Sequence, residues 1–220
     1  MPKSWRVLPA LLLSTLLTSP VLFAFNSPLS DEAIREAYFL GQRRDEKMTA
    51  FLEKYKQHLR EPDRGPFVSS VEFLTPFALA VLQSKDRSIG YSAQQAAEEH
   101  RGVDESVVVN IEVLFTESYG ALIQQPISER SGAPTGFAFR SSDFWRDIDV
   151  QVIVKDKVIK PARFTGEPQY LCSEGGCQLT GATIRMEFPA RFVDSDLATM
   201  HVVPPEGPEV WVDFDLAGLR

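Results

Sequence analysis

Alternating apolar and polar residues are the clearest pattern along the chain, and the pattern recurs in separate segments. Between residues 106 and 116, apolar side chains such as Val107 share one face, while Asn110 and Glu112 share the other. Similar alternation covers residues 149–154, 158–165, 183–188 and 209–216. A period of two with polar residues on one side is typical of antiparallel strands with one wet face. Five or more such strands with Pro- and Gly-rich connections predict a sandwich or an open barrel.

A different period occupies residues 31–60, where apolar residues recur at steps of three and four. That spacing predicts one apolar helix face, which begins after a cap at Ser30 or Asp31 and ends before Pro62. Gly41 and the charged stretch after it predict either two helices or one kinked helix. In both cases the apolar face must cover another part of the protein.

Two shorter segments further along carry helix signals as well. Residues 68–74 predict a strand, but residues 76–83 fit two structures equally. One is a buried strand, and the other is a short helix with Thr75 as its cap and Pro76 at its first position. A capping box that starts at Ser92 predicts a further helix to about residue 101.

Taken together, these patterns predict an α+β protein. Its N-terminal helical segment, residues 25–65, packs on an antiparallel β-sandwich formed by residues 66–220. The best boundary is near Gly65, where proline and glycine interrupt the helical pattern. The order of alternating strands resembles that of immunoglobulin-like sandwiches, in strand pattern only. A resemblance of this kind implies an architecture and no function.

The first 24 residues have the layout of a secretory signal peptide. A basic start precedes an apolar run over residues 7–17, and the Leu-Phe-Ala sequence that ends at Ala24 offers a cleavage site. The alternative is an uncleaved anchor, because residues 7–25 are long enough to span a bilayer. Pro20 and several polar residues interrupt that run, which favours cleavage. The processed protein is then expected to be periplasmic or extracellular, with no transmembrane segment.

The chain is acidic, with 23 basic and 30 acidic residues and a formal net charge of −7. Cleavage after Ala24 removes Lys3 and Arg6 and no acid, which changes the net charge to −9. An acidic surface repels nucleic acid and anionic lipid, and it favours cations or basic proteins as partners. We therefore expect a protein partner or an envelope component, and no nucleic acid.

Cys172 and Cys177 are the only cysteines, and two glycines lie between them. In an oxidising compartment such a pair predicts a disulfide that closes a short loop. A redox pair is less favoured, because the spacing is wider than Cys-x-x-Cys and no neighbouring base would lower a thiol pKa. A zinc site would need further ligands, and the sequence nearby holds no other cysteine or histidine.

The sequence contains no strong motif for a metal, a cofactor or a nucleophile. The three histidines, His58, His100 and His201, lack a second histidine at a ligand spacing, and neither a phosphate-binding glycine loop nor Gly-x-Ser-x-Gly occurs. Asp194 and Asp196 resemble half of a calcium loop, but a polar turn explains them better. We therefore predict no cofactor, no metal site and no catalytic residue, and a carboxylate-based hydrolase is the weakest of the functional hypotheses.

Aromatic residues are the positive candidates for binding. Trp211 takes an outward position in its predicted strand, beside Asp213, and Trp145 comes just before another strand. Exposed tryptophans stack on sugar rings or anchor protein contacts. The competing hypothesis, which the sequence favours, places Trp211 beneath the N-terminal helices, whose apolar face needs a surface.

The leading functional hypothesis is an exported, non-catalytic module that acts through protein or envelope-surface contacts. The alternative is a carbohydrate- or small-ligand-binding domain that uses Trp145, Trp211 and Asp213.

Overall fold

The protein is described here from a computed structural model. It covers residues 25, 27–87, 90–117, 119, 122–126, 135–174, 176–194 and 196–220, with only the backbone of residues 122–126 and 135–138. The predicted leader, residues 1–24, lies outside the described residues, and its cleavage stays a prediction.

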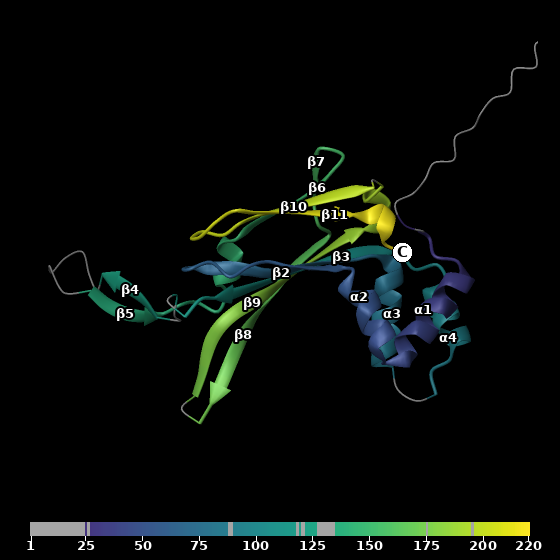
Figure 1. The fold of residues 1–220 in the computed structure, drawn as a ribbon, viewed down its shortest axis with the longest axis horizontal. Helices are drawn as coiled ribbons and strands as arrows, with labels where there is room; N and C mark the ends of the chain where they lie inside the picture. Colours follow the sequence, from purple (N-terminus) through teal and green to yellow (C-terminus); the bar gives the residue numbers. More distant parts are fainter. Residues whose placement is uncertain are drawn as a thin grey trace, which may run out of the picture.

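Two antiparallel sheets face each other at the centre of the protein (Figure 1). The five-stranded sheet has the order β1-β2-β3-β9-β8, and the four-stranded sheet has the order β11-β10-β6-β7. The strands of the larger sheet are β1 (Lys56–His58), β2 (Pro66–Leu74), β3 (Ser106–Phe115), β8 (Arg163–Ser173) and β9 (Gly176–Pro189). Those of the smaller sheet are β6 (Asp149–Val154), β7 (Lys157–Ile159), β10 (Leu197–Val203) and β11 (Val210–Asp215). This arrangement confirms the predicted α+β fold with a sandwich-like, sheet-dominated core.

The main core lies between the two sheets and is built from the apolar positions of the alternating strands. Val107, Val109 and Ile111 of β3 are fully buried there. Across the gap, the rings of Phe73 on β2 and Phe214 on β11 lie 5.6 Å apart. The period of two seen in the sequence therefore corresponds to one face of each sheet that is turned into the core.

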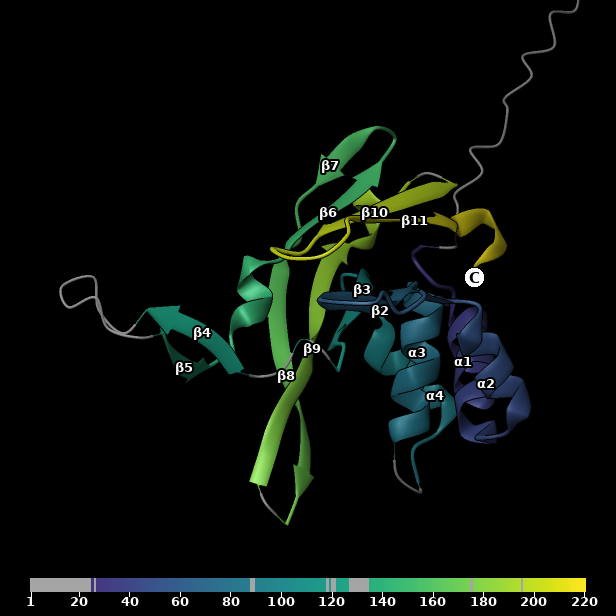
Figure 2. The same ribbon diagram turned by 60° about the vertical axis from the view of Figure 1, so that its left-hand side comes forward.

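Four helices pack together at one end of the five-stranded sheet (Figure 2). They are α1 (Asp31–Arg43), α2 (Glu46–Glu53), α3 (Pro76–Asp86) and α4 (Ala93–His100). Each begins at a side-chain cap, and the caps are Ser30, Asp45, Thr75 and Ser92. The predicted capping box at Ser92 is present, with Gln95 as its second member. Gly41 allows α1 to approach α3, because a Cβ at this position would meet the carbonyl oxygen of Val81 at 2.3 Å.

Shorter elements complete the fold. The 3₁₀ helices are η1 (Phe144–Asp147), η2 (Ala190–Phe192) and η3 (Leu216–Gly218), and β4 (Leu122–Pro126) pairs with β5 (Thr135–Phe139) in a separate hairpin. The β8–β9 hairpin projects beyond the edge of the sandwich (Figures 1 and 2). In the part of the chain that the structure describes, no helix has the length and hydropathy needed to cross a membrane.

In three segments the structure either differs from the sequence-based prediction or decides between its alternatives. The helical pattern of residues 31–60 ends at Glu53, because Tyr55 turns into a core and residues 56–58 pair with β2 instead. Residues 76–83 are helical, since the Thr75 hydroxyl accepts a hydrogen bond from the Ala78 amide and caps α3. The strand expected over residues 158–165 is split into β7 and β8, and Pro161 lies between them.

Candidate functional site

The helices cover the outer face of the five-stranded sheet at one end only. There Leu74 on β2 and Val108 on β3 pack with Ala78 of α3 and with Tyr55, which is only 1% exposed. These two strand residues point away from the main core, so the apolar surface they present is the surface that the helices need. Helix α3 and the end of the N-terminal helical segment therefore cover part of the larger sheet, while α1 packs on α3 and α4.

Beyond this cover, two successive rows of paired residues cross the sheet, and every member of both rows is polar. Each row takes one residue from each of the five strands. The first row is Lys56, Glu72, Asn110, Arg185 and Thr165, and the second is His58, Ser70, Glu112, Thr183 and Glu167. The polarity of the outer face thus changes where the helical cover ends.

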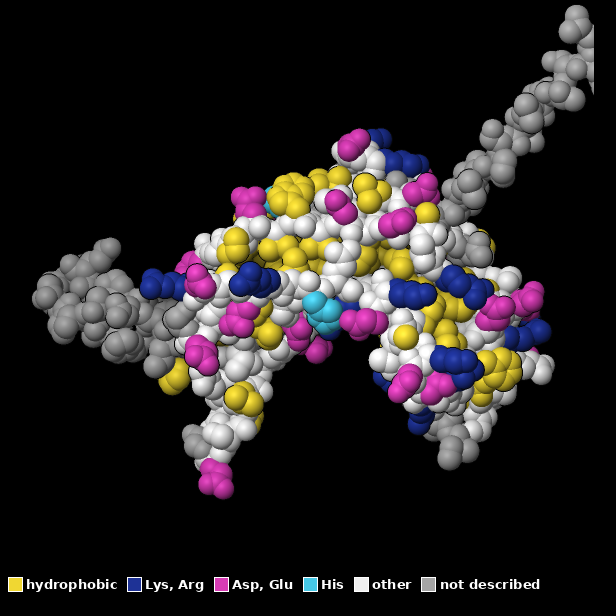
Figure 3. Space-filling model, in the orientation of Figure 1, with side chains coloured by type: hydrophobic (Ala, Val, Ile, Leu, Met, Phe, Trp, Pro, Cys, Tyr) yellow, Lys and Arg dark blue, Asp and Glu magenta, His cyan; other side chains and the backbone are white. Residues whose placement is uncertain are grey.

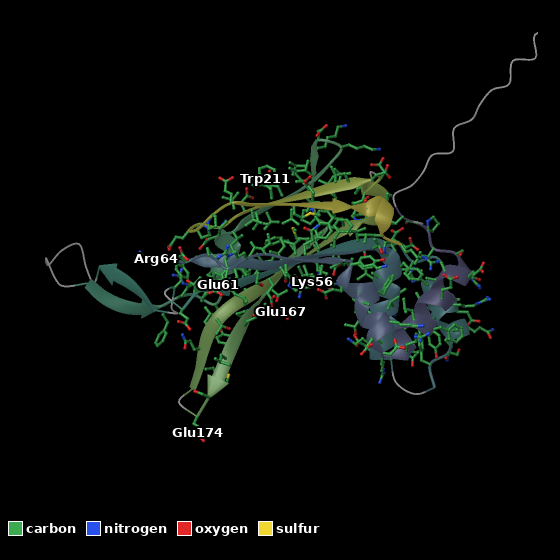
Figure 4. All side chains as sticks on the ribbon, in the orientation of Figure 1. Lys56, Glu61, Arg64, Glu167, Glu174 and Trp211 are labelled. Atoms are coloured by element: carbon green, nitrogen blue, oxygen red, sulfur yellow. A yellow bond between two sulfur atoms is a disulfide. The ribbon has the colours of Figure 1, made fainter. Side chains whose placement is uncertain are left out.

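These rows line a hollow of about 390 Å³. We call it the polar cleft, and its lining residues are Lys56, Ser70, Glu72, Asn110, Glu112, Thr165, Glu167, Thr183 and Arg185. Figure 3 shows the molecule hollowed between its helical part and the β8–β9 hairpin, with acidic side chains and a histidine beside the hollow. Figure 4 shows Lys56 and Glu167 on this side of the sheet. The cleft is therefore a concave, hydrogen-bonding surface.

Glu112 lies on the central strand of the cleft, and its neighbours hold its carboxylate in place. The hydroxyls of Ser69 and Ser70 donate to its Oε2 at 2.8 and 3.1 Å, and the Gln169 amide donates to its Oε1 at 3.4 Å. Consecutive residues of a regular strand point to opposite faces, but the register shifts between Val68 and Ser70. This bulge allows two consecutive serines to reach one carboxylate.

The surroundings of Glu112 favour its ionised form. Partial burial alone would raise the pKa of this carboxyl, but hydrogen bonds from Ser69, Gln169 and Ser70 and the charge of Lys56 together lower it. The group is therefore a fixed negative charge at neutral pH. A carboxyl held in this state accepts hydrogen bonds and attracts cations, and it is poorly suited to donate a proton.

The other charged groups of the cleft are also connected to neighbours. The Asn110 amide donates to Glu72 Oε2 at 2.7 Å, and Arg185 Nε donates to Glu187 Oε1 at 3.1 Å. Glu72 and Glu112 are diagonal neighbours on β2 and β3, a relation that separates residues by about 7–8 Å. The cleft therefore presents carboxylates and hydroxyls at fixed positions, over a width of five strands.

Trp211 lies on the other side of the sandwich, on the outer face of the four-stranded sheet (Figure 4). It is 59% exposed, so the expectation that the N-terminal helices cover it is wrong. The helices bury most of their apolar side chains against one another, and α3 with Phe51 and Tyr55 packs on the five-stranded sheet. Asp213 is exposed two residues further along the same strand, so the structure places these two candidate residues on one face.

Trp145 is separated from that face. It belongs to η1, is 6% exposed, and packs in the main core with its ring 5.6 Å from the ring of Phe164. Gly166 on β8 lies against the indole, because a Cβ there would come within 2.2 Å of the ring. The structure therefore gives Trp145 a packing role and does not bring it together with Trp211 and Asp213.

Cys172 and Cys177 form the predicted disulfide, with an S–S distance of 2.00 Å. They are a cross-strand pair near the end of the β8–β9 hairpin. The apolar side chains of Tyr170 and Leu171 beside them are 50% and 68% exposed. The disulfide thus joins the two strands at the projecting end of the hairpin.

Each histidine faces one carboxylate. Nε2 lies 2.8 Å from Glu53 for His58, 3.2 Å from Glu105 for His100 and 3.1 Å from Glu209 for His201. Among the described residues, no three His, Cys, Asp or Glu side chains gather closely enough to hold a metal ion. These pairs are local contacts at hydrogen-bonding distance between single side chains.

The sequence was compared with known proteins. It matches no protein-family model and no curated protein. The site must therefore be judged on its geometry.

The sequence alone does not predict the polar cleft. Alternation placed Asn110 and Glu112 on an outward face, but nothing local indicated that Lys56, Arg185 and Glu167 join them. The available signal was the change along the outward positions of β3 from Val108 to Asn110 and Glu112, which marks the edge of the helical cover.

Proposed function

We propose that this protein is an exported, non-catalytic binding module that holds a segment of a partner protein in the polar cleft. The observation that carries the proposal is the pair of all-polar rows across five strands, next to the edge of the helical cover. Each row offers both hydrogen-bond donors and acceptors. An extended polypeptide offers the complementary groups on its own backbone and side chains.

The charges of the cleft favour a basic partner. Glu72, Glu112 and Glu167 outnumber Lys56 and Arg185, and Arg185 already pairs with Glu187. The remaining negative charge and the formal net charge of −7 attract lysine and arginine side chains. We therefore propose that the bound segment carries at least one of these two residues.

Hydrolysis by a pair of carboxylates is a weaker explanation of the same residues. A glycosidase of this type needs one carboxyl with a raised pKa as its general acid. The pKa of Glu112 is lowered, and its oxygens accept hydrogen bonds from Ser69, Ser70 and Gln169. These contacts suit a binding residue better than a proton donor.

Export is part of the proposal. It is supported by the signal-peptide layout of residues 1–24 in the sequence and by the Cys172–Cys177 disulfide, since disulfides persist in oxidising compartments. A periplasmic or extracellular location would also bring the cleft to envelope proteins.

Photo-crosslinking in the producing cells tests this function. A benzoylphenylalanine at position 167 would report on the cleft, and the same group at position 174 is the matched control, because Glu167 and Glu174 are both exposed on the β8–β9 hairpin (Figure 4). We expect one protein adduct from position 167, and we expect its yield to fall when the same protein also carries Glu112→Gln. Equal adducts from both positions, or none from position 167, would contradict the proposed function.

A further inference from the structure

The outer face of the four-stranded sheet carries a second, different constellation. The outward positions along β11 and just before it are Glu209, Trp211, Asp213 and Asp215, and all four side chains are exposed. A single aromatic residue is thus flanked by acids on both sides along the strand. This face lies on the opposite side of the sandwich from the polar cleft (Figure 4).

The indole of Trp211 is held flat by the residue beneath it. His201 is its cross-strand partner on β10, and the two rings stack with centroids 3.7 Å apart and an angle of 12° between their planes. The His201 side chain is only 14% exposed and lies 3.1 Å from a Glu209 carboxylate oxygen. One face of the indole is therefore occupied, while the residue as a whole remains 59% exposed.

The carboxylate of Asp213 is also oriented. The Thr199 hydroxyl on β10 donates to its Oδ1 at 2.6 Å. Within the described residues, neither Asp213 nor Asp215 forms an ion pair with a lysine or arginine. Among the residues that the structure describes, the negative charge beside the indole is thus not paired with a lysine or arginine.

We infer that this face binds a guanidinium group, stacked on the free face of Trp211 and paired with the carboxylate of Asp213. Indole attracts cations through its negative ring face, and it does so best among the aromatic side chains. A guanidinium is planar, stacks on aromatic rings and is more weakly hydrated than an ammonium, so it fits this site better than a lysine does. The inference does not depend on the polar cleft.

A titration of the purified protein tests the inference, with the indole Nε1–H signal of Trp211 followed by NMR. The probes are N-acetyl-arginine amide, N-acetyl-lysine amide and methyl glucoside. We expect the arginine probe to shift the signal with an affinity about fivefold higher than the lysine probe, and methyl glucoside to leave it unchanged. An arginine-containing peptide serves as a fourth probe: tighter binding than the amide would indicate a protein as the source, and equal binding a small cationic molecule.

Variants of Trp211 and Asp213 measure separately how stacking on the indole and pairing with the carboxylate contribute to the affinity. The affinity of the variants is followed on the backbone amide signals of β11, because Trp211→Leu has no indole signal. Trp211→Leu, which keeps an apolar side chain over His201, should reduce affinity for the arginine probe about fivefold or more, and Asp213→Asn should reduce both the affinity and its salt dependence. Asp156→Asn, on the turn between β6 and β7, is the control and should bind as the parent does. Both variants must keep the parent's circular dichroism spectrum. Equal affinity for arginine and lysine, a response to methyl glucoside alone, or unchanged binding by Trp211→Leu would overturn the inference.

Discussion

The two outer faces of the sandwich both carry carboxylates, but they hold them differently. In the polar cleft, Glu112 accepts hydrogen bonds from three side chains and Glu72 accepts one from Asn110. On the opposite face, the acids around Trp211 are exposed, and Asp213 accepts a hydrogen bond from Thr199. We therefore expect substitution of Glu112 to lower stability, and substitution of Trp211 or Asp213 to cost the fold little.

The position of the helices explains why the outer faces of the two sheets differ. Helix α3, together with Phe51 and Tyr55, packs on Leu74 and Val108 of the larger sheet, so this sheet has one covered end and one open, polar end. No helix among the described residues covers the outer face of the smaller sheet, and Trp211 is exposed there. Placement of the helices on the larger sheet thus leaves a concave, polar surface beside them, whereas the outer face of the smaller sheet presents Trp211.

Trp145 gives the largest contrast with the exposed Trp211. Trp145→Ala should lower the free energy of unfolding by about 3–5 kcal/mol, because it removes a buried indole from the main core and leaves a cavity beside Gly166. Urea denaturation followed by circular dichroism measures the loss. A change below about 1 kcal/mol would mean that this tryptophan is not a packing residue, and the contrast with Trp211 would fail.

Glu112 should give an intermediate effect that depends on pH. Glu112→Ala removes the acceptor of three hydrogen bonds, and we expect a loss of about 1–2 kcal/mol at pH 7. Because folding lowers the pKa of this carboxyl, its contribution is present above the unfolded pKa, near 4.5, and is lost as the pH falls through the lower folded value. Thermal melts between pH 7 and pH 3 should therefore show a shallower acid decline for Glu112→Gln than for the parent.

Glu167→Gln is the matched control for that measurement. Glu167 lines the same cleft but is exposed, and its side chain makes no hydrogen bond within the described part of the chain. Its variant should follow the parent's pH curve. If both variants flatten the curve equally, the stability would come from the general acidity of the cleft and not from the contacts of Glu112.

The sequence predicted local features of this molecule well and non-local ones poorly. Alternation identified the strands and the outward position of Trp211, since the side-chain period depends only on the residues of one strand. For residues 76–83 the sequence does not distinguish a helix from a buried strand, because a short buried apolar run has no distinctive period. The cover of Trp211 and the rows of the cleft depend on which strands pair, and pairs such as Glu112 with Ser70 and Thr183 join distant segments.

Trp211→Ala should have the smallest effect on stability, about 0.5 kcal/mol. The side chain is mostly exposed, and the contact it loses is a surface stack on His201, which is worth little compared with a buried contact. The same urea experiment measures it beside Trp145→Ala, and the two variants remove the same number of atoms. A loss as large as that of Trp145→Ala would show that the four-stranded sheet depends on its outer face for stability. The polar cleft and the face around Trp211 would then not differ in how much their residues contribute to stability.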